Sequence, residues 1–281
     1  MMGRLKLPCK ESAMNPSILP EHTRTAALLG EDGFFALQKA SVAVFGIGGV
    51  GGHLAEALAR AGVGRIHLVD RDVVSLSNIN RQAVALHSTV GRPKAEVMAE
   101  RIKDINPACE VTASVCFYLP ENAEDFDLSA YDFVADCVDT VAAKLELAVR
   151  CEAVGTPLIA AMGAGNKLHP EAFRISDISK TETDPLARVM RRELKKRGVR
   201  KLLCVWSDEP PIPANLMGDD GRPAPASISF TPSAMGLIMA GEIIRRLAGG
   251  YTENAKSRTG QCKNGGGGAI DEKSCGCPDA S

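Results

Sequence analysis

The sequence lacks a strong charge imbalance, a long apolar stretch and an internal repeat. Its 281 residues carry a formal net charge of -1, so composition alone does not indicate a nucleic-acid-binding protein, and any such binding must come from a local patch. Because no apolar run reaches ~18 residues, we predict no membrane span. The first twenty residues hold no apolar stretch long enough for a signal peptide. We therefore expect a cytoplasmic protein.

The composition is that of a globular protein, with 45% hydrophobic and 24% charged residues. The nine cysteines are odd in number and scattered, which favours reduced thiols. We expect three parts along the chain. Residues 1–20 form a flexible N-terminus, within which Met14 is an alternative start to Met1. One folded domain covers residues 21–250, and a disordered, glycine-rich tail covers residues 251–281.

Short apolar runs alternate with segments of helical periodicity. The first unit is a strand at 41–46, a glycine turn, a helix at 50–61 and a strand at 65–70, which is a βαβ crossover with parallel strands. Further strands are predicted at 110–115, 133–138, 157–161, 173–178 and 201–206, and further helices at 93–105, 141–153, 184–197 and 231–247. This alternation predicts an α/β fold with a Rossmann-like, doubly wound, mostly parallel sheet and a C-terminal extension. Residues 210–225 are predicted to form a loop.

A glycine-rich turn follows the first predicted strand. Gly46, Gly48 and Gly51 fit the pattern G-x-G-x-x-G, and Gly49 lies between them. Such glycines let backbone N–H groups approach phosphate oxygens at a helix N-terminus. Asp70 ends the next strand, where a carboxylate can accept hydrogen bonds from a ribose diol. Taken alone, the motif is equally typical of an NAD-dependent dehydrogenase.

Charged residues further along favour ATP over NAD. A triphosphate carries about four negative charges and requires cations together with a carboxylate that holds Mg²⁺. Arg81 and Lys94 supply the cations, Asn78 lies in the polar segment beside Arg81, and Asp139 follows a strand end as a candidate Mg²⁺ ligand. Each residue alone is also explained as a surface ion pair or a solvated side chain. Their joint occurrence with the glycine turn predicts a site for ATP and Mg²⁺.

Five motifs resemble those of the ThiF/MoeB/ubiquitin-activating-enzyme superfamily in order and spacing. They are GIGGVG (46–51), DRD (70–72), SNINRQ (77–82), GRPK (91–94) and DCVDT (136–140). The resemblance implies a carboxylate-adenylating domain in which Asp70 binds the ribose, within a motif that also holds Asp72. It implies that Arg81 and Lys94 bind phosphates and that Asp139 holds Mg²⁺. Family members are commonly homodimers in which an N-terminal arginine, here Arg24, reaches the ATP of the partner.

Two later segments, AMGAGNKLHP (161–170) and DISKTETDPLARVMRRELKKRGV (177–199), resemble the tRNA threonylcarbamoyladenosine dehydratases of that superfamily. This resemblance implies ATP-dependent cyclisation of threonylcarbamoyladenosine in tRNA to a hydantoin. It leaves open whether the carboxylate is adenylated or phosphorylated, and whether a sulfur-transfer partner protein takes part. Cys204 is a candidate nucleophile because related enzymes form thioesters, although a buried strand thiol is the favoured interpretation.

Two other functions compete with tRNA dehydration. The first is adenylation of a ubiquitin-like sulfur carrier, but enzymes of that kind usually hold a structural zinc with two C-x-x-C pairs, and this chain has no C-x-x-C. The second is a non-catalytic nucleotide-binding subunit, which the retained Arg81, Lys94 and Asp139 disfavour. A basic run at residues 188–201, opposed by Glu193, is either a tRNA-binding patch or an ordinary solvated helix.

Overall fold

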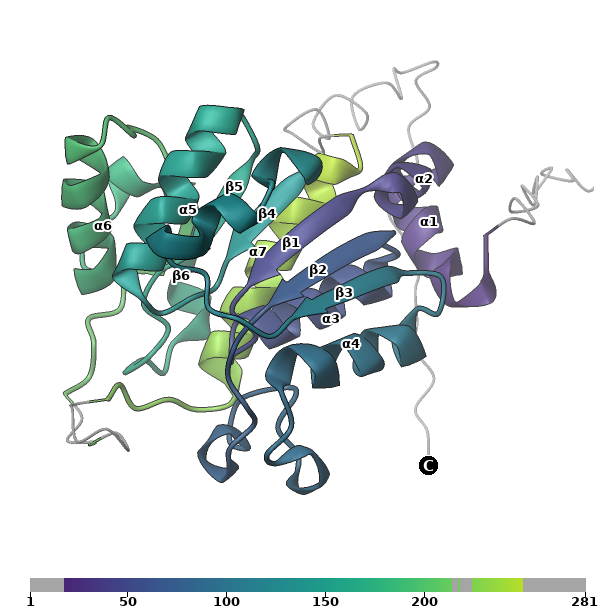
Figure 1. The fold of residues 1–281 in the computed structure, drawn as a ribbon, viewed down its shortest axis with the longest axis horizontal. Helices are drawn as coiled ribbons and strands as arrows, with labels where there is room; N and C mark the ends of the chain where they lie inside the picture. The colour runs from purple at the N-terminus through teal and green to yellow at the C-terminus, as the bar shows by residue number, and fades with distance from the viewer. Residues whose placement is uncertain (1–17, 214–216, 218–223, 250–281) are drawn as a thin grey trace, which may run out of the picture. The chain divides into compact units, whose positions relative to one another are not determined.

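A seven-stranded sheet lies at the centre of the computed structural model, which describes residues 18–213, 217 and 224–249 (Figure 1). The strands are β1 (Ser41–Phe45), β2 (Arg65–Val69), β3 (Glu110–Ser114), β4 (Phe133–Asp136), β5 (Leu158–Ala161), β6 (Phe173–Asp177) and β7 (Leu203–Ser207). Their order across the sheet is β3-β2-β1-β4-β5-β7-β6. All neighbouring strands are parallel except β6 and β7, so the predicted doubly wound, mostly parallel sheet is confirmed.

Helices flank the sheet on both faces (Figure 1). The α-helices are α1 (Thr23–Leu29), α2 (Glu31–Lys39), α3 (Gly51–Ala61), α4 (Lys94–Ile105), α5 (Val141–Val154), α6 (Pro185–Lys196) and α7 (Phe230–Leu247). The 3-10 helices are η1 (Pro20–His22), η2 (Leu76–Asn78), η3 (His87–Thr89), η4 (Pro120–Asp125), η5 (Leu128–Ala130), η6 (Pro170–Ala172) and η7 (Ile178–Lys180). Helices α3, α4 and α7 pack together on one face, and α5 packs with α6 on the other.

Strand β1 shows how the apolar runs build the two cores. Val42 and Val44 pack into the core beneath α3 and α7. Ala43 and Phe45 point to the opposite face, where Phe126 joins a second apolar cluster. Because successive side chains of a strand alternate between faces, a strand buried on both sides needs a continuous apolar run. That run is what identifies β1 in the sequence.

The predicted strands and longer helices are all present, and their ends differ from prediction by at most two residues. Strand β6 runs antiparallel because no helical crossover separates it from β5: the chain leaves β5 at the carboxyl edge and re-enters the sheet from that edge. The short helices α1 and α2 were not predicted. Strand β4 ends at Asp136 rather than Val138, since the chain turns there into the loop that carries Asp139.

Several predictions concern parts of the chain that the structure leaves undescribed or untested. The N-terminal segment up to residue 17, most of the 214–223 loop and the tail from residue 250 lie outside the described residues, so the domain limits at 20 and 250 stay predictions. Within the described ranges no helix combines the length and apolarity needed to cross a bilayer. The cysteines in this part of the chain are free thiols.

Candidate nucleotide-binding site

The site forms where the strand order of the sheet reverses. From β1 the chain moves to β2 on one side, and β4 lies against the other side of β1. Ligands of open α/β sheets bind at such a switch point, beyond the carboxyl ends of the strands. Gly46 has φ 89°, and a Cβ there would lie 2.6 Å from the Cys137 carbonyl oxygen. A Cβ on Gly51 would lie 1.8 Å from the Gly46 carbonyl oxygen, so both positions require glycine.

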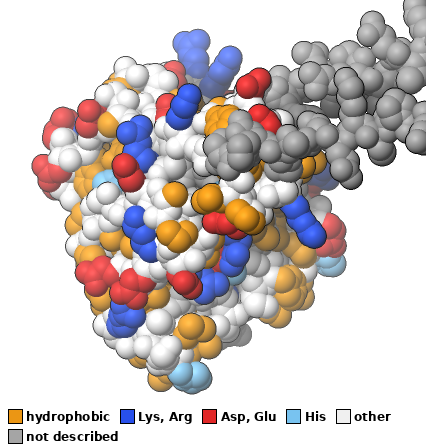
Figure 2. All heavy atoms as spheres, turned by 90° about the vertical axis from the view of Figure 1, so that its right-hand side faces the viewer, with side chains coloured by type: hydrophobic (Ala, Val, Ile, Leu, Met, Phe, Trp, Pro, Cys, Tyr) orange, Lys and Arg blue, Asp and Glu red, His pale blue; other side chains and the backbone are white. Residues whose placement is uncertain are grey.

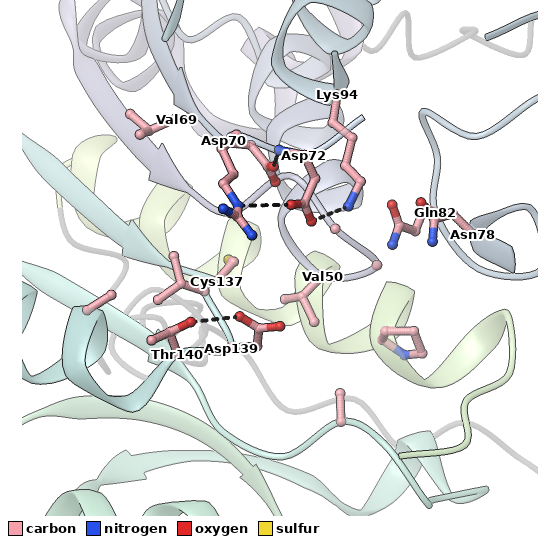
Figure 3. Close-up of a pocket in the computed structure, with 18 of the residues that line it drawn as sticks. Val50, Val69, Asp70, Asp72, Asn78, Gln82, Lys94, Cys137, Asp139 and Thr140 are labelled. Atoms are coloured by element: carbon pink, nitrogen blue, oxygen red, sulfur yellow. Dashed lines mark hydrogen bonds and ion pairs between the residues drawn. The ribbon is translucent and has the colours of Figure 1, made fainter. Parts of the chain in front are cut away.

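A pocket of about 380 Å³ opens above this turn (Figure 3). Nine residues that the sequence predicted as nucleotide ligands line it: Gly46, Gly48, Gly49, Asp70, Asp72, Asn78, Arg81, Lys94 and Asp139. They come from the glycine turn, the end of β2, the 76–82 segment, the start of α4 and the loop after β4. The structure therefore brings together groups that are spread over about a hundred positions of sequence.

Asp70 is fixed between the glycine turn and the end of β2. Its Oδ2 accepts a hydrogen bond from the Ile47 backbone N–H at 2.5 Å, and its Oδ1 accepts one from the Asp72 N–H at 2.8 Å. Burial raises the pKa of the Asp70 carboxyl above its ordinary value, against those two hydrogen bonds and Lys94, which lower it. A carboxylate has about four lone-pair sites, so acceptor capacity remains for ribose hydroxyls.

Lys94 opens α4 with its side chain buried along the pocket wall. The Lys94 Nζ lies 2.9 Å from Asp72 Oδ2, and only 7% of the lysine side chain is exposed, against 53% for the aspartate. The Lys94 backbone N–H also donates to the Asp72 carbonyl oxygen. Figure 3 shows this pair on one side of the pocket. The ammonium is therefore held in place by an ion pair with an exposed carboxylate, which an incoming phosphate can replace.

Arg81 and Asn78 come from the polar segment after β2. Arg81 Nη1 donates to the Ser77 carbonyl oxygen at 3.0 Å and to Asn80 Oδ1 at 2.9 Å. These bonds use one nitrogen of a guanidinium that has five donors. Burial lowers the pKa of Arg81 from its usual value. Asn78 Oδ1 accepts the Ser75 N–H at 3.1 Å, so this buried amide supports the segment that presents Arg81.

Asp139 lies across the pocket from Asp72 and Lys94 (Figure 3). It is exposed in the loop after β4, and its Oδ1 accepts the Thr140 hydroxyl at 3.3 Å. A carboxylate oxygen is a ligand that Mg²⁺ accepts. In the part of the chain that the structure describes, no group of three or more His, Cys, Asp or Glu could hold a metal ion. Asp139 is therefore the residue in this pocket that we predict to hold Mg²⁺.

Sequence reasoning missed the buried ion pair beneath the Asp139 loop. Lys144 Nζ lies 2.9 Å from Asp136 Oδ1, both side chains are 0% exposed, and the same ammonium donates to the Val138 carbonyl oxygen at 3.0 Å. Burial raises the pKa of the Asp136 carboxyl, and Lys144 opposes that effect. The available signal was a lysine on the apolar face of the helix that follows Asp139. A second missed contact is Arg71 over the Phe117 ring, at 3.4 Å from the centroid, on the pocket lining.

Two predicted residues lie away from the pocket. Arg24 is exposed on α1, next to α2, which leads into the start of β1; it therefore lies toward the edge of the sheet opposite the glycine turn (Figure 1). Cys204 is fully buried in β7, where its thiol donates to the Ser176 carbonyl oxygen at 3.5 Å. Burial raises the pKa of Cys204 to about 12, so the reactive thiolate is scarce at neutral pH.

Together, the fold and the pocket define a Rossmann-like nucleotide-binding protein whose pocket is lined by two cations, Arg81 and Lys94, and by the carboxylate of Asp139. The sequence profile of the ThiF family matches residues 22–267, and the chain belongs to that family. This confirms the superfamily resemblance of the five motifs.

Similarity to characterised proteins extends along most of the chain. It is 45% identical over 242 residues to the tRNA threonylcarbamoyladenosine dehydratase of Bacillus subtilis, an alignment that covers 82% of this chain and 95% of that protein. The structure of the Escherichia coli tRNA N6-threonylcarbamoyladenosine dehydratase in complex with ATP superposes with a TM-score of 0.74 at 34% identity, over 85% of this chain and 96% of the other. The Escherichia coli molybdopterin-synthase adenylyltransferase is 33% identical over 224 residues, covering 78% of this chain and 77% of that protein.

Proposed function

We propose that this chain is an ATP-dependent tRNA threonylcarbamoyladenosine dehydratase. The observation that carries the proposal is the convergence of Asp70, Arg81, Lys94 and Asp139 on one pocket above the glycine turn. That set suits a magnesium-bound nucleoside triphosphate, and a dehydrogenase has no use for it. The relatives named for this reaction supply the substrate: a tRNA that carries threonylcarbamoyladenosine.

The reaction begins with the threonyl carboxylate, which is a poor electrophile. One of its oxygens attacks the α-phosphorus of ATP, and pyrophosphate leaves. A nitrogen of the urea-like linkage then attacks the activated carbonyl carbon, AMP leaves, and a five-membered hydantoin closes with the loss of one proton. Because the nucleophile is tethered to the electrophile, ring closure needs little beyond correct placement. Arg81 and Lys94 bind the phosphates, and Asp139 would hold Mg²⁺, which would supply further positive charge against the phosphates.

The alternative substrate, the C-terminus of a ubiquitin-like sulfur carrier, has weaker support. The absence of C-x-x-C pairs from the sequence disfavours it. The basic run on α6 favours a polyanionic substrate instead, because Arg188, Arg192 and Lys195 are exposed there. Arg191 is an exception, since its guanidinium turns inward and donates to the Thr181 carbonyl oxygen at 2.7 Å.

The test combines the protein with ATP, Mg²⁺ and tRNA that carries threonylcarbamoyladenosine. The nucleoside released from the product should have lost the mass of one water molecule. ATP labelled at the α-phosphate should yield AMP, which separates adenylation from phosphorylation, whose product is ADP. Pyrophosphate exchange that requires a carrier ending in Gly-Gly, and that ignores tRNA, would instead support the sulfur-carrier alternative.

We further infer that the protein acts as a homodimer in which Arg24 completes the partner's site. The placement of Arg24 far from the pocket of its own chain supports this inference. Arg24→Ala and Asp139→Asn should each be inactive alone. When the two variants are mixed and allowed to exchange subunits, the mixed dimer regains one intact site, so activity should recover to about a quarter of wild type. No recovery after proven exchange would place Arg24 outside the partner's site.

A further inference from the structure

One wall of the pocket comes from chain segments outside the five nucleotide motifs. Ala164 and Gly165 follow β5, whereas Pro225 and Ser227 precede α7, and all four line the pocket. We call these four residues the uncharged wall. The two segments touch directly, because a Cβ on Gly165 would lie 2.7 Å from the Cβ of Pro225. The sequence segment AMGAGNKLHP, which resembles the dehydratase branch, thus contributes half of this wall.

Asn166 links the two segments by hydrogen bonds. Its backbone N–H donates to the Ala226 carbonyl oxygen at 2.7 Å, and its Oδ1 accepts the Ala226 N–H at 2.7 Å. Its carbonyl oxygen accepts the Ile212 N–H at 2.7 Å. Among the described residues Asn166 is the only one other than glycine with positive φ, at 58°. A left-handed residue costs about 1 kcal/mol and is kept where its surroundings fix it, commonly at functional sites.

Asn80 joins the uncharged wall to the phosphate-binding groups. Its Oδ1 accepts from Arg81 Nη1 at 2.9 Å, while its Nδ2 donates to the Ser227 carbonyl oxygen at 3.0 Å. A single side-chain amide therefore bridges the arginine and the wall. The glycine turn also meets this region, since a Cβ on Gly49 would lie 3.1 Å from the Cβ of Pro232 at the start of α7. The wall consequently adjoins Arg81 and the glycine turn.

We propose that the uncharged wall is where the carboxylate substrate meets the bound nucleotide, and that Asn166 and Asn80 are its positioning residues. This proposal rests on the proposed function. Ala, Gly, Pro and Ser side chains carry no negative charge, so a carboxylate can approach the α-phosphate along them without repulsion. The wall also keeps water from the activated carbonyl. If water attacks that carbon instead of the tethered nitrogen, AMP leaves and the original carboxylate returns, so ATP is consumed without dehydration.

The test compares two substitutions of Asn166 in the full-length protein. Asn166→Gly keeps the left-handed backbone accessible but removes Oδ1, whereas Asn166→Asp keeps both the backbone preference and an acceptor oxygen. For the glycine variant we expect the KM for threonylcarbamoylated tRNA to rise about fivefold, which corresponds to the removal of about one hydrogen bond. This variant should also form more AMP per hydantoin than the wild type, because water then reaches the activated carbonyl more often. Its Kd for ATP, measured by calorimetry, should stay within about twofold of wild type. Asn166→Asp should keep the hydrogen bond to Ala226 and with it the wild-type yield of hydantoin per AMP, whereas its negative charge beside the wall should raise the KM for tRNA.

Asn80→Ala provides a contrast, because it releases Arg81 and the wall together. We expect it to weaken both ATP binding and tRNA use. The role of the wall would be overturned if the wild-type protein is active and Asn166→Gly has the same KM for tRNA and forms the same amount of AMP per hydantoin. Equal losses of ATP affinity and tRNA use in that variant would also overturn it. A wild-type protein that binds ATP yet dehydrates no tRNA would contradict the proposed function, and this inference with it.

Discussion

The pocket and helix α6 differ in how their charged side chains are placed. In and beneath the pocket, two lysines with buried side chains pair with aspartates: Lys94 with Asp72, and Lys144 with Asp136. On α6, the ion pairs lie at the surface. Glu193 there forms ion pairs with Arg192, Lys196 and Arg197. These three cations lower the pKa of the Glu193 carboxyl to about 2.

This difference indicates that buried charges position functional groups, whereas exposed charges bind other molecules. A buried ion is expensive to desolvate, so it persists where it holds a functional group in place. Exposed lysines and arginines gain little from their neighbours and stay available to a large polyanion. The face with α1 and α2 shows neither pattern, since basic and acidic side chains are interspersed there (Figure 2). On this basis we assign the proposed chemistry to the pocket and the proposed tRNA contact to α6.

The largest effect is expected from the charges that face the nucleotide. Asp139→Asn should lower kcat by about 10²- to 10³-fold, because it removes the carboxylate charge proposed to hold Mg²⁺. Binding of ATP should lose its magnesium dependence, which titrations with and without EDTA measure. Asp132→Asn is the control at the opposite end of β4, where the Asp132 carboxylate accepts the Ser41 N–H at 2.8 Å. Full activity of Asp139→Asn would contradict the role of the Asp139 carboxylate in the pocket.

The buried pair should have the next largest effect. Lys144→Met leaves the Asp136 carboxylate buried without a cation, which we expect to destabilise the fold by about 3–5 kcal/mol in urea unfolding. The double variant Lys144→Met, Asp136→Leu should regain much of that stability, because no charge stays buried. Its activity should nevertheless stay low, since no ammonium then holds Val138 and the Asp139 loop. A stable double variant with wild-type kcat would reduce the pair to a purely structural role.

Removing positive charges from α6 should weaken the binding of tRNA and leave the binding of ATP unchanged. The triple variant Arg188→Gln, Arg192→Gln, Lys195→Gln should weaken tRNA binding. The slope of log K against log salt should decrease by about 0.9 for each phosphate that the variant no longer neutralises. ATP affinity should not change. Lys39→Gln on α2 is the control, because Lys39 is exposed within a helix at the other side of the molecule (Figure 1). Unchanged salt dependence in the triple variant would assign α6 no part in tRNA binding.

The smallest effect is expected at Cys204. Because this thiol is buried and its pKa is raised to about 12, it should resist iodoacetamide in the folded protein and react only after unfolding. Cys204→Ala should keep kcat within about twofold and lower stability by about 1 kcal/mol. Mass spectrometry of the alkylated protein and steady-state kinetics check the two statements. If Cys204→Ala is folded but inactive, the Cys204 thiol would have to be considered a catalytic nucleophile again.

Much of the site could be predicted because its motifs are local. A glycine turn between a buried strand and a helix marks the proposed phosphate site, and the fold brings Asp70, Arg81, Lys94 and Asp139 into the pocket above it. Asn80 and Asn166 lie inside quoted motifs, but their linking role could not be predicted from them. Their partners, Ala226 and Ser227, lie far along the chain, and no periodicity marks a hydrogen bond between distant loops.

The sequence by itself determined the doubly wound sheet, the glycine turn after β1 and the family, because burial and turn geometry leave a periodic signature in neighbouring residues. Only the tertiary structure decided which charges are buried, which segments close the pocket, and that Cys204 points into the core rather than into the site. The physical reason is that desolvation and ion pairing depend on everything within a few ångströms of a group, and most of those neighbours are distant in sequence.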